Sequence, residues 1–370
     1  MKQKPSSFAP PRDSEIVLKA SKALADVLSH LPAFRGIRTE RPESCEREGF
    51  DGVLDVSLVS GGRLYLCIEA KNSGEPRFLR TGVISLAERI EQAKNRGKGA
   101  FYGILAAPYI SKTGAEICEE AGVGYIDLAG NCLIRHEAVY VRIEGRPNPF
   151  TTSRGMKSVF ERSSVRSGVV LRHFFEHPGK VWKIDQMVEA SGVSLGQVSK
   201  VKRFLEDREW IESTKAGFRL TDPAGVLAEW SETYNRKPND GMDFYALDPV
   251  PEIEAKLSEA FRRKHISGAL TGFSGGVRYV PAVRYQRVHA YVDRGHFEDL
   301  PASFGWKRVS SGANVSLFVP YDSCVLIGVR EVGNGVVVSP VQAYLDLMGL
   351  KGRGEEAAQA VLEGAIGKKW

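Results

Sequence analysis

The sequence predicts a multidomain α/β protein built from three parts. The chain has 370 residues, more than one ordinary domain needs, and its 42% hydrophobic and 26% charged residues suffice for packed cores. Strand-like and helix-like segments alternate in both end regions, and a mostly helical block separates them. We expect an α/β domain at 1–148, a helical domain at 149–235 and a C-terminal α/β domain at 236–370.

The N-terminal part begins with a predicted helix, SEIVLKASKALADVLSHL, in which apolar residues recur at helical spacing. Two strands, VLDVSLV and RLYLCIEAK, follow and are joined by Ser-Gly-Gly, which is typical of a hairpin turn. The unit continues with a helix over 82–96, the strand GAFYGILAA, the helix SKTGAEICEEAG and the short strands GYIDLAG and AVYVRIEG. RPNPFTTSRG is a linker to the next part.

The second hairpin strand ends in charged residues. RLYLCIEAK is apolar on both faces until its last three residues, which predicts a buried strand whose polar end reaches an edge of the sheet. If the hairpin pairs the two strands, Asp55 approaches Glu69. Two carboxylates and the carbonyl of Ala70 suit Mg²⁺, and Lys71 can orient or deprotonate a water. The alternative is a solvent-exposed Glu–Lys pair with little energetic effect.

At these residues the chain resembles the restriction-endonuclease-like nucleases, whose pattern reads here as Asp55, then Glu69-Ala-Lys71, then a helix carrying Gln92. The resemblance implies metal ligands at Asp55 and Glu69, a catalytic Lys71 and a requirement for Mg²⁺. Glu15 is a candidate for the first-helix carboxylate of some members. The resemblance also allows a domain that keeps this fold as a binding platform without cleaving DNA.

The middle part predicts three helices, VRSGVVLRHFFEHPG, KIDQMVEASG and SLGQVSKVKRFLEDREWI, followed by the strands WIEST and FRLTD around the turn KAG. Gly192 can take the left-handed conformation that the turn between the last two helices needs. This order is typical of a winged helix, with a recognition helix that enters the major groove of DNA.

The predicted DNA contacts lie on the third helix and the wing. Its apolar residues face the core, so its polar residues remain for DNA. We expect Ser194 and Gln197 at base edges, Ser199 on the free surface, and Lys200, Lys202, Arg203, Lys215 and Arg219 at phosphates. A winged helix that binds protein is the alternative.

The distribution of charge supports a polyanionic partner. The net charge is only +6, but 151–183 holds seven basic residues against two acidic ones, a net of +5. Such a block attracts polyanions, although a solvated linker is the alternative. The basic residues are Arg154, Lys157, Arg162, Arg166, Arg172, Lys180 and Lys183.

A wider resemblance rests on the order of several segments between 50 and 365. GVGYIDLAGNCLI, RPNPF, SGVSLGQVSKVKRFLEDREWI, ALTGFSGG, NVSLFVPYD and VVSPVQAYLDLMGLKGRGEEAAQAVLE resemble the AbiE-type (AbiEi) transcriptional regulators, the antitoxins of type IV toxin–antitoxin pairs. The resemblance implies a repressor of its own toxin operon that opposes a nucleotidyltransferase toxin. This chain differs from the smaller antitoxins of that family in carrying the additional nuclease-like N-terminal part.

The remaining expectations concern location, assembly and cofactors. MKQKPSSFAPPRD has no apolar core, and AFYGILAAPYI is about half a membrane span, so we expect a soluble cytoplasmic protein. Its five cysteines should be reduced, and DNA binding should need no cofactor.

A homodimer is expected because one recognition helix reads few base pairs. A nucleotidyltransferase site at GFSGG and RVHAYVDR lacks a second carboxylate after Asp293.

Overall fold

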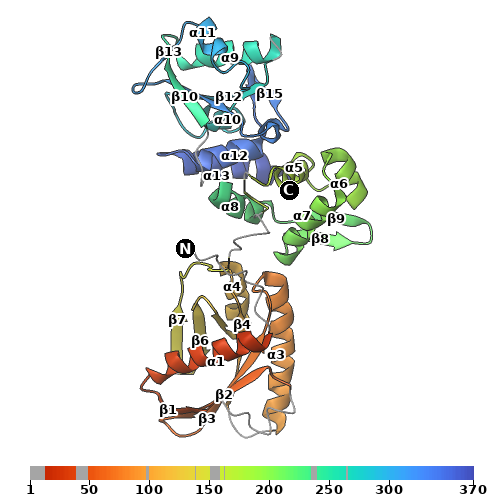
Figure 1. Cartoon of the computed structure of the whole chain (residues 1–370), viewed down its shortest axis with the longest axis vertical. Helices are drawn as coiled ribbons and strands as arrows, with labels where there is room; N and C mark the ends of the chain where they lie inside the picture. The colour runs from red at the N-terminus through yellow and green to blue at the C-terminus, as the bar shows by residue number, and fades with distance from the viewer. Residues whose placement is uncertain are drawn as a thin grey trace, which may run out of the picture. The chain divides into compact units, whose positions relative to one another are not determined.

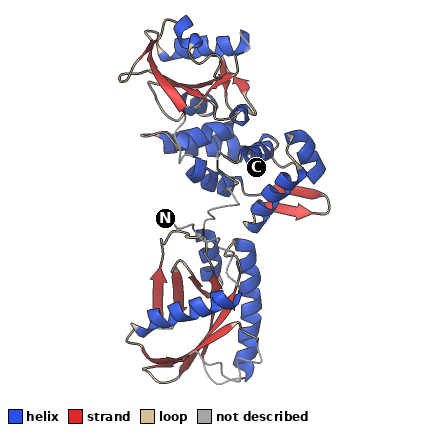
Figure 2. Ribbon diagram, in the orientation of Figure 1, coloured by secondary structure: helices blue, strands red, loops and turns tan. Residues whose placement is uncertain are grey.

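The computed structural model describes residues 13–38, 49–96, 100–137, 139–150, 159–161, 163–234, 240–263 and 266–370. Its internal contacts divide the chain into two compact units, formed mainly by Met1–Gly155 and mainly by the residues from Met156 onward. Figures 1 and 2 show the elements of each unit. Both units contain helices and a mixed sheet, which confirms the α/β class. Among the described residues, no helix combines the length and apolar character needed to cross a membrane.

The first unit is a seven-stranded sheet in the order β1-β2-β3-β4-β5-β6-β7. β3, β4 and β5 run parallel, and the other neighbours are antiparallel. The strands are β1 (Phe34–Arg38), β2 (Gly52–Leu58), β3 (Arg63–Ala70), β4 (Ala100–Ala107), β5 (Gly124–Asp127), β6 (Cys132–His136) and β7 (Val139–Ile143). The helices are α1 (Asp13–Ser29), α3 (Pro76–Arg96) and α4 (Lys112–Glu120).

Helices cover both faces of the central strands. Leu66 and Ile68 of β3 pack in one core with Ile16 of α1, whereas Cys67 packs in a second core with Leu86 of α3. Because side chains alternate along a strand, β3 must be apolar on both faces, as the sequence predicted. β1 and β6 are two strands that the sequence analysis did not predict. β1 is an outer strand whose residues are all at least partly exposed, so it lacks a clear apolar run.

The second unit begins with the middle segment, which we define as residues 159–234. The three predicted helices and the two predicted strands are confirmed, and a further helix follows them. Gly192 ends α6 with φ of 63°, in the left-handed conformation expected of it. The elements are α5 (Val165–Glu176), α6 (Ile184–Ser191), α7 (Leu195–Asp207), β8 (Ile211–Thr214), β9 (Gly217–Leu220) and α8 (Pro223–Tyr234).

The C-terminal segment, residues 240–370, forms a second seven-stranded sheet in the order β13-β10-β14-β12-β11-β16-β15. Its strands are β10 (Asp240–Tyr245), β11 (Gly268–Leu270), β12 (Val288–Val292), β13 (Lys307–Arg308), β14 (Val315–Val319), β15 (Arg330–Val332) and β16 (Gly335–Val337). Its helices are α9 (Val250–Arg263), α10 (Gly272–Tyr279), α11 (Asp299–Ser303), α12 (Pro340–Met348) and α13 (Gly354–Val361). Shorter helical turns are η1 (Ser323–Leu326), η2 (Leu362–Ile366) and η3 (Gly367–Lys369).

The middle and C-terminal segments share one hydrophobic core. Val198 and Leu205 of α7 belong to the same cluster as Leu345 of α12 and Val361 of α13. The sequence predicts separate domains here, 149–235 and 236–370, with a boundary that falls in 235–239, outside the described residues. The shared core instead makes the two segments parts of one unit.

A buried polar chain also joins these segments. Arg172 of α5 is 1% exposed, and its Nη2 donates a hydrogen bond to Gln342 Oε1 of α12 at 2.5 Å. Gln342 Nε2 donates to Asp346 Oδ1 at 3.0 Å, and Thr271 and Tyr291 donate to the same carboxylate. Gln342 therefore connects a buried guanidinium to a buried carboxylate. Separating α5 from α12 would leave these buried polar groups without their hydrogen-bond partners, which costs free energy.

The described cysteines behave as expected. Cys67, Cys118, Cys132 and Cys324 are buried, whereas Cys45 lies outside the described residues. Burial raises the pKa of Cys118 and of Cys132 to about 12. Since the thiolate is the reactive form, both thiols should be inert at neutral pH.

Replacing Gln342 with leucine should destabilise the second unit by about 2–3 kcal/mol, because the buried Arg172 guanidinium keeps its hydrogen bond to the Gly168 carbonyl but loses the one to Gln342. Urea unfolding followed by tryptophan fluorescence measures this change, since Trp230 lies 5.0 Å from the Arg172 guanidinium. The double variant Arg172→Met/Gln342→Leu should lose less stability than the two single variants together. Arg353→Met, which removes an exposed ion pair with Glu356, is the control. If the double variant loses as much stability as the two single variants together, Arg172 and Gln342 do not stabilise the unit through their hydrogen bond.

Candidate functional site

The third helix of the middle segment, α7, is held by its apolar side. Val198, Val201 and Leu205 are at most 1% exposed and pack in the core of the second unit. The backbone carbonyl of Ser194 accepts from the amides of Gln197 and Val198 and starts the helix. Figure 1 shows α7 beside the β8–β9 hairpin. The opposite side of the helix is left to solvent.

The outward surface of α7 carries two cations without an ion pair. Arg203 is exposed and Lys200 is partly exposed, and neither forms an ion pair with a described residue. Ser199 lies one turn before Arg203 on the same side of the helix and is partly exposed, and Ser194 is exposed at the helix start. The structure therefore groups four of the predicted DNA contacts on one accessible surface.

Two predicted contacts on α7 are engaged within the unit instead. Gln197 Nε2 donates to Ser167 Oγ of α5 at 2.7 Å, and Ser167 is 1% exposed. Lys202 is paired with Glu206 one turn later, and its Nζ lies 5.5 Å from the centroid of the Phe218 ring. The sequence pattern placed both residues on the polar surface; it could not show Ser167 or Phe218, which come from other elements, whereas Glu206 lies on α7 itself at the i,i+4 spacing.

The β8–β9 hairpin presents one predicted contact freely. Lys215 is exposed in the turn between the strands. Arg219 is also exposed, but its Nη2 lies 2.7 Å from Glu212 Oε2 on the opposite strand. Exposed ion pairs of this kind are weak and can exchange for a phosphate.

The basic block is only partly available to a polyanion. Arg154, Lys157 and Arg162 lie outside the residues whose side chains are described. The expectation was wrong for Arg172, which is fully buried in the polar chain described above. The exposed members are Arg166, Lys180 and Lys183, all in the middle segment.

The hairpin register of the first unit does not bring Asp55 to Glu69. Asp55 lies opposite Tyr65, whereas Gly52 lies opposite Ile68, so Glu69 is four residues further along β3 than the position facing Asp55. Asp55 is 8% exposed and accepts from Arg63 Nη1 at 3.4 Å. The expected approach of these carboxylates was wrong because the strands run antiparallel from a short turn.

Asp51 takes the place that the sequence analysis gave to Asp55. It directly precedes β2, and its Oδ2 accepts a hydrogen bond from the Ala70 amide at 2.8 Å, between Glu69 and Lys71. Counting residues outward from the predicted Ser-Gly-Gly turn pairs Val59 with Arg63 and puts Val53 opposite Glu69, whereas the observed register pairs Ser57 with Arg63, so the count alone would not have found Asp51. The three charged residues Asp51, Glu69 and Lys71 thus meet at one edge of the sheet.

Glu69 is surrounded by cations at this edge. It is 3% exposed, with Lys71 Nζ 2.8 Å from Oε1 and Arg89 Nη2 2.7 Å from Oε2. The contact between Arg89 and Glu69 is an ion pair without a hydrogen bond, because the Arg89 N–H groups donate to Ser85 Oγ and to the Gly49 carbonyl instead. Lys71 is packed tightly, since a Cβ at Gly82 would lie 2.8 Å from its Cε.

Two residues named with this site lie elsewhere. Gln92 is exposed, and Arg89, one turn earlier on α3, is the side chain that reaches Glu69. Glu15 is exposed and pairs with Lys19 at 2.7 Å. A coarse helix prediction could not choose between Arg89 and Gln92.

The carboxylates fit Mg²⁺ in ligand type but not in charge balance. Two carboxylates, completed by water and substrate phosphate, are a common magnesium set. Within the described residues, however, no group of three or more His, Cys, Asp or Glu side chains could hold a metal. Arg89 and Lys71 already compensate the charge of Glu69, so a metal ion must compete with the guanidinium.

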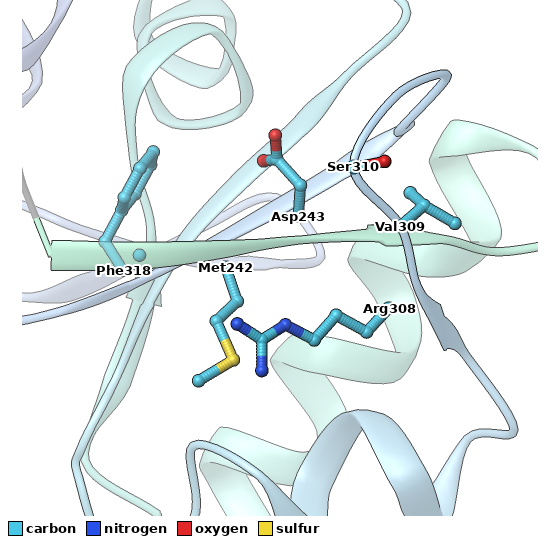
Figure 3. A pocket seen from close by; sticks show the side chains of 7 residues that line it. Met242, Asp243, Arg308, Val309, Ser310 and Phe318 are labelled. Carbon is cyan, nitrogen blue, oxygen red and sulfur yellow. The ribbon is translucent and has the colours of Figure 1, made fainter.

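Two features of the C-terminal segment complete the candidate sites. Asp293 accepts from the Ser267 amide at 2.9 Å and contacts His296, so it serves its own loop. A cavity of about 430 Å³ lies beside β10, with Asp243 and Phe318 on one side of the strand and Met242 and Arg308 on the other (Figure 3). Neither feature contains two neighbouring carboxylates.

Comparison with known proteins finds a similarity in part of the chain. Residues 219–367 match the family model described as "Transcriptional regulator, AbiEi antitoxin, Type IV TA system". No curated protein and no solved structure matches the chain significantly. The matched region starts in β9 and covers α8 and nearly all of the C-terminal segment. This part of the chain is therefore similar to antitoxins that act as transcriptional regulators.

Proposed function

We propose that the protein is a regulator that binds duplex DNA through α7. The observation that carries this function is the outward surface of α7, where Lys200 and Arg203 have no ion pair among the described residues. Unpaired cations on a rigid helix can neutralise phosphates without breaking internal interactions, and the two serines can contact bases or phosphates. Arg166, Lys180 and Lys183 extend the positive surface of the same segment.

The middle segment has the arrangement of a winged helix. Its three helices are followed by a two-stranded hairpin, and Trp182, between α5 and α6, exchanges backbone hydrogen bonds with Phe218 at 2.8 and 2.9 Å. This bridge adds a third extended segment to the hairpin and fixes it against the helices. In that arrangement α7 enters the major groove while the turn carrying Lys215 contacts the backbone.

The regulatory role is antitoxin-like. Its support is the match of residues 219–367 to a family of type IV antitoxins described as transcriptional regulators. Binding at a promoter blocks polymerase, so a repressor of the protein's own operon, with a cognate toxin encoded beside it, is the specific form we propose. We propose a homodimer as the binding species, because two copies of α7 double the number of base pairs that are read.

The double variant Lys200→Ala/Arg203→Ala should bind duplex DNA more weakly at every sequence and lower the slope of log K against log salt by about 2. Fluorescence anisotropy over a salt series measures both effects. Lys351→Ala/Arg263→Ala removes the same charge from exposed positions of the C-terminal segment and should change neither. Equal affinity and slope for the wild type and the Lys200/Arg203 variant would refute DNA binding through α7.

A second function, Mg²⁺-dependent DNA cleavage, is favoured by one observation. Asp51, Glu69 and Lys71 converge at the edge of the first sheet. Asp51 and Glu69 would hold the ion, which when bound supplies Lewis-acid activation of a phosphodiester. Lys71 would orient the attacking water, and the middle segment would deliver the DNA. The cations around Glu69 make this the less favoured function.

The nuclease function predicts different effects for the two aspartates of the hairpin. Asp51→Ala should abolish Mg²⁺-dependent nicking of a plasmid, whereas Asp55→Ala should retain it, because only Asp51 lies beside Glu69. Gel analysis of supercoiled plasmid measures nicking, and duplex affinity should be unchanged in both variants. A wild-type protein that nicks no duplex or single-stranded substrate would eliminate this function and leave the regulator standing.

A further inference from the structure

The first turn of α7 contains a glycine that the fold does not require. Gly196 is the second residue of the helix, is exposed and is not in the left-handed conformation. A Cβ built on it would meet nothing within 4 Å. Glycine disfavours a helix relative to alanine because it loses more backbone freedom. Neither backbone geometry nor packing within the described residues therefore explains it.

Gly196 lies on the side of α7 that faces away from the core. At 100° per residue, it projects opposite the buried Val198, Val201 and Leu205 and along the same side as Lys200 and Arg203. At Gly196 the helix surface therefore has no side chain, and this gap lies beside the two unpaired cations. A helix can approach a partner most closely where a side chain is missing, as close backbone approach is a common use of glycine.

The neighbouring residue is an exposed leucine without a core role. Leu195 is 54% exposed and is not among the residues that pack against the hydrophobic core of the unit. Single exposed leucines are common and carry no argument alone. This one stands next to the gap, at the end of the helix that meets base edges when a recognition helix enters the major groove.

We propose that the first turn of α7 determines sequence specificity, with Gly196 as the point of closest approach to the duplex and Leu195 as a contact to a thymine methyl group. This inference rests on the proposed function. In the major groove only thymine presents a methyl group, and apolar side chains are its usual partners. Gln197, held by Ser167, is a positioning residue that fixes the rotation of α7.

The test uses the full-length protein and a duplex that the wild type selects from a random library. Gly196→Ala should bind the selected duplex at least about tenfold more weakly, because the added methyl keeps the helix from the base edges. Its affinity for an unselected duplex, which depends on phosphate contacts, should be unchanged. Its thermal midpoint should not fall, since alanine favours a helix. This combination separates a contact role from a structural one.

The thymine contact is tested with uracil-substituted duplexes. Replacing thymine by uracil at the contacted position removes only the methyl group and should weaken wild-type binding by about threefold to tenfold. Leu195→Ala should show a similar loss on the thymine duplex and no further loss on the uracil duplex. Leu18→Ala, at a leucine 71% exposed in the first unit, is the matched control and should bind as the wild type does.

Each outcome decides between distinct claims. Equal binding of the selected duplex by Gly196→Ala, or loss of binding to both duplexes in parallel, overturns the role of Gly196. Uracil substitutions without effect at every position overturn the thymine contact. A wild type that selects no duplex overturns the proposed function itself, and this inference with it.

Discussion

The orientation of α7 depends on its burial against the core of the second unit. Val198, Val201 and Leu205 occupy one side of the helix, so Lys200 and Arg203 must project from the other. The buried connection from Arg172 through Gln342 to Asp346 joins the same three-helix segment to α12. If the helix binds duplex DNA as proposed, its side chains are already arranged, which lowers the entropy lost on binding.

The two candidate sites differ in how their charges are compensated. On the outward surface of α7, two cations have no acidic partner among the described residues, so an external polyanion can supply one. At the edge of the first sheet, Glu69 is already close to Lys71 and Arg89. An added cation gains little there because the carboxylate charge is shared. The difference favours DNA binding over metal-dependent cleavage.

Much of the fold could be predicted from the sequence, and the errors have physical causes. Regular apolar periodicity located α1, α7 and the β2–β3 hairpin. Strand pairing fixed a register that put Asp51, and not Asp55, beside Glu69. The partner of Gln197 lies on another element, so no local pattern could show that this side chain is engaged. The i,i+4 pair of Lys202 with Glu206 lies within α7 and could have been read from the sequence. Burial of Arg172 follows from tertiary packing.

The central claim, that duplex DNA contacts the outward surface of α7, is tested most directly by site-specific photo-crosslinking. A photoreactive amino acid at Ser199 would lie beside Lys200 and Arg203, and one at the exposed Ser323 serves as the control. We predict a DNA adduct from position 199 that excess unlabelled duplex abolishes, and none from position 323. An adduct from a position in the first unit such as Asn72, with none from 199, would contradict the account.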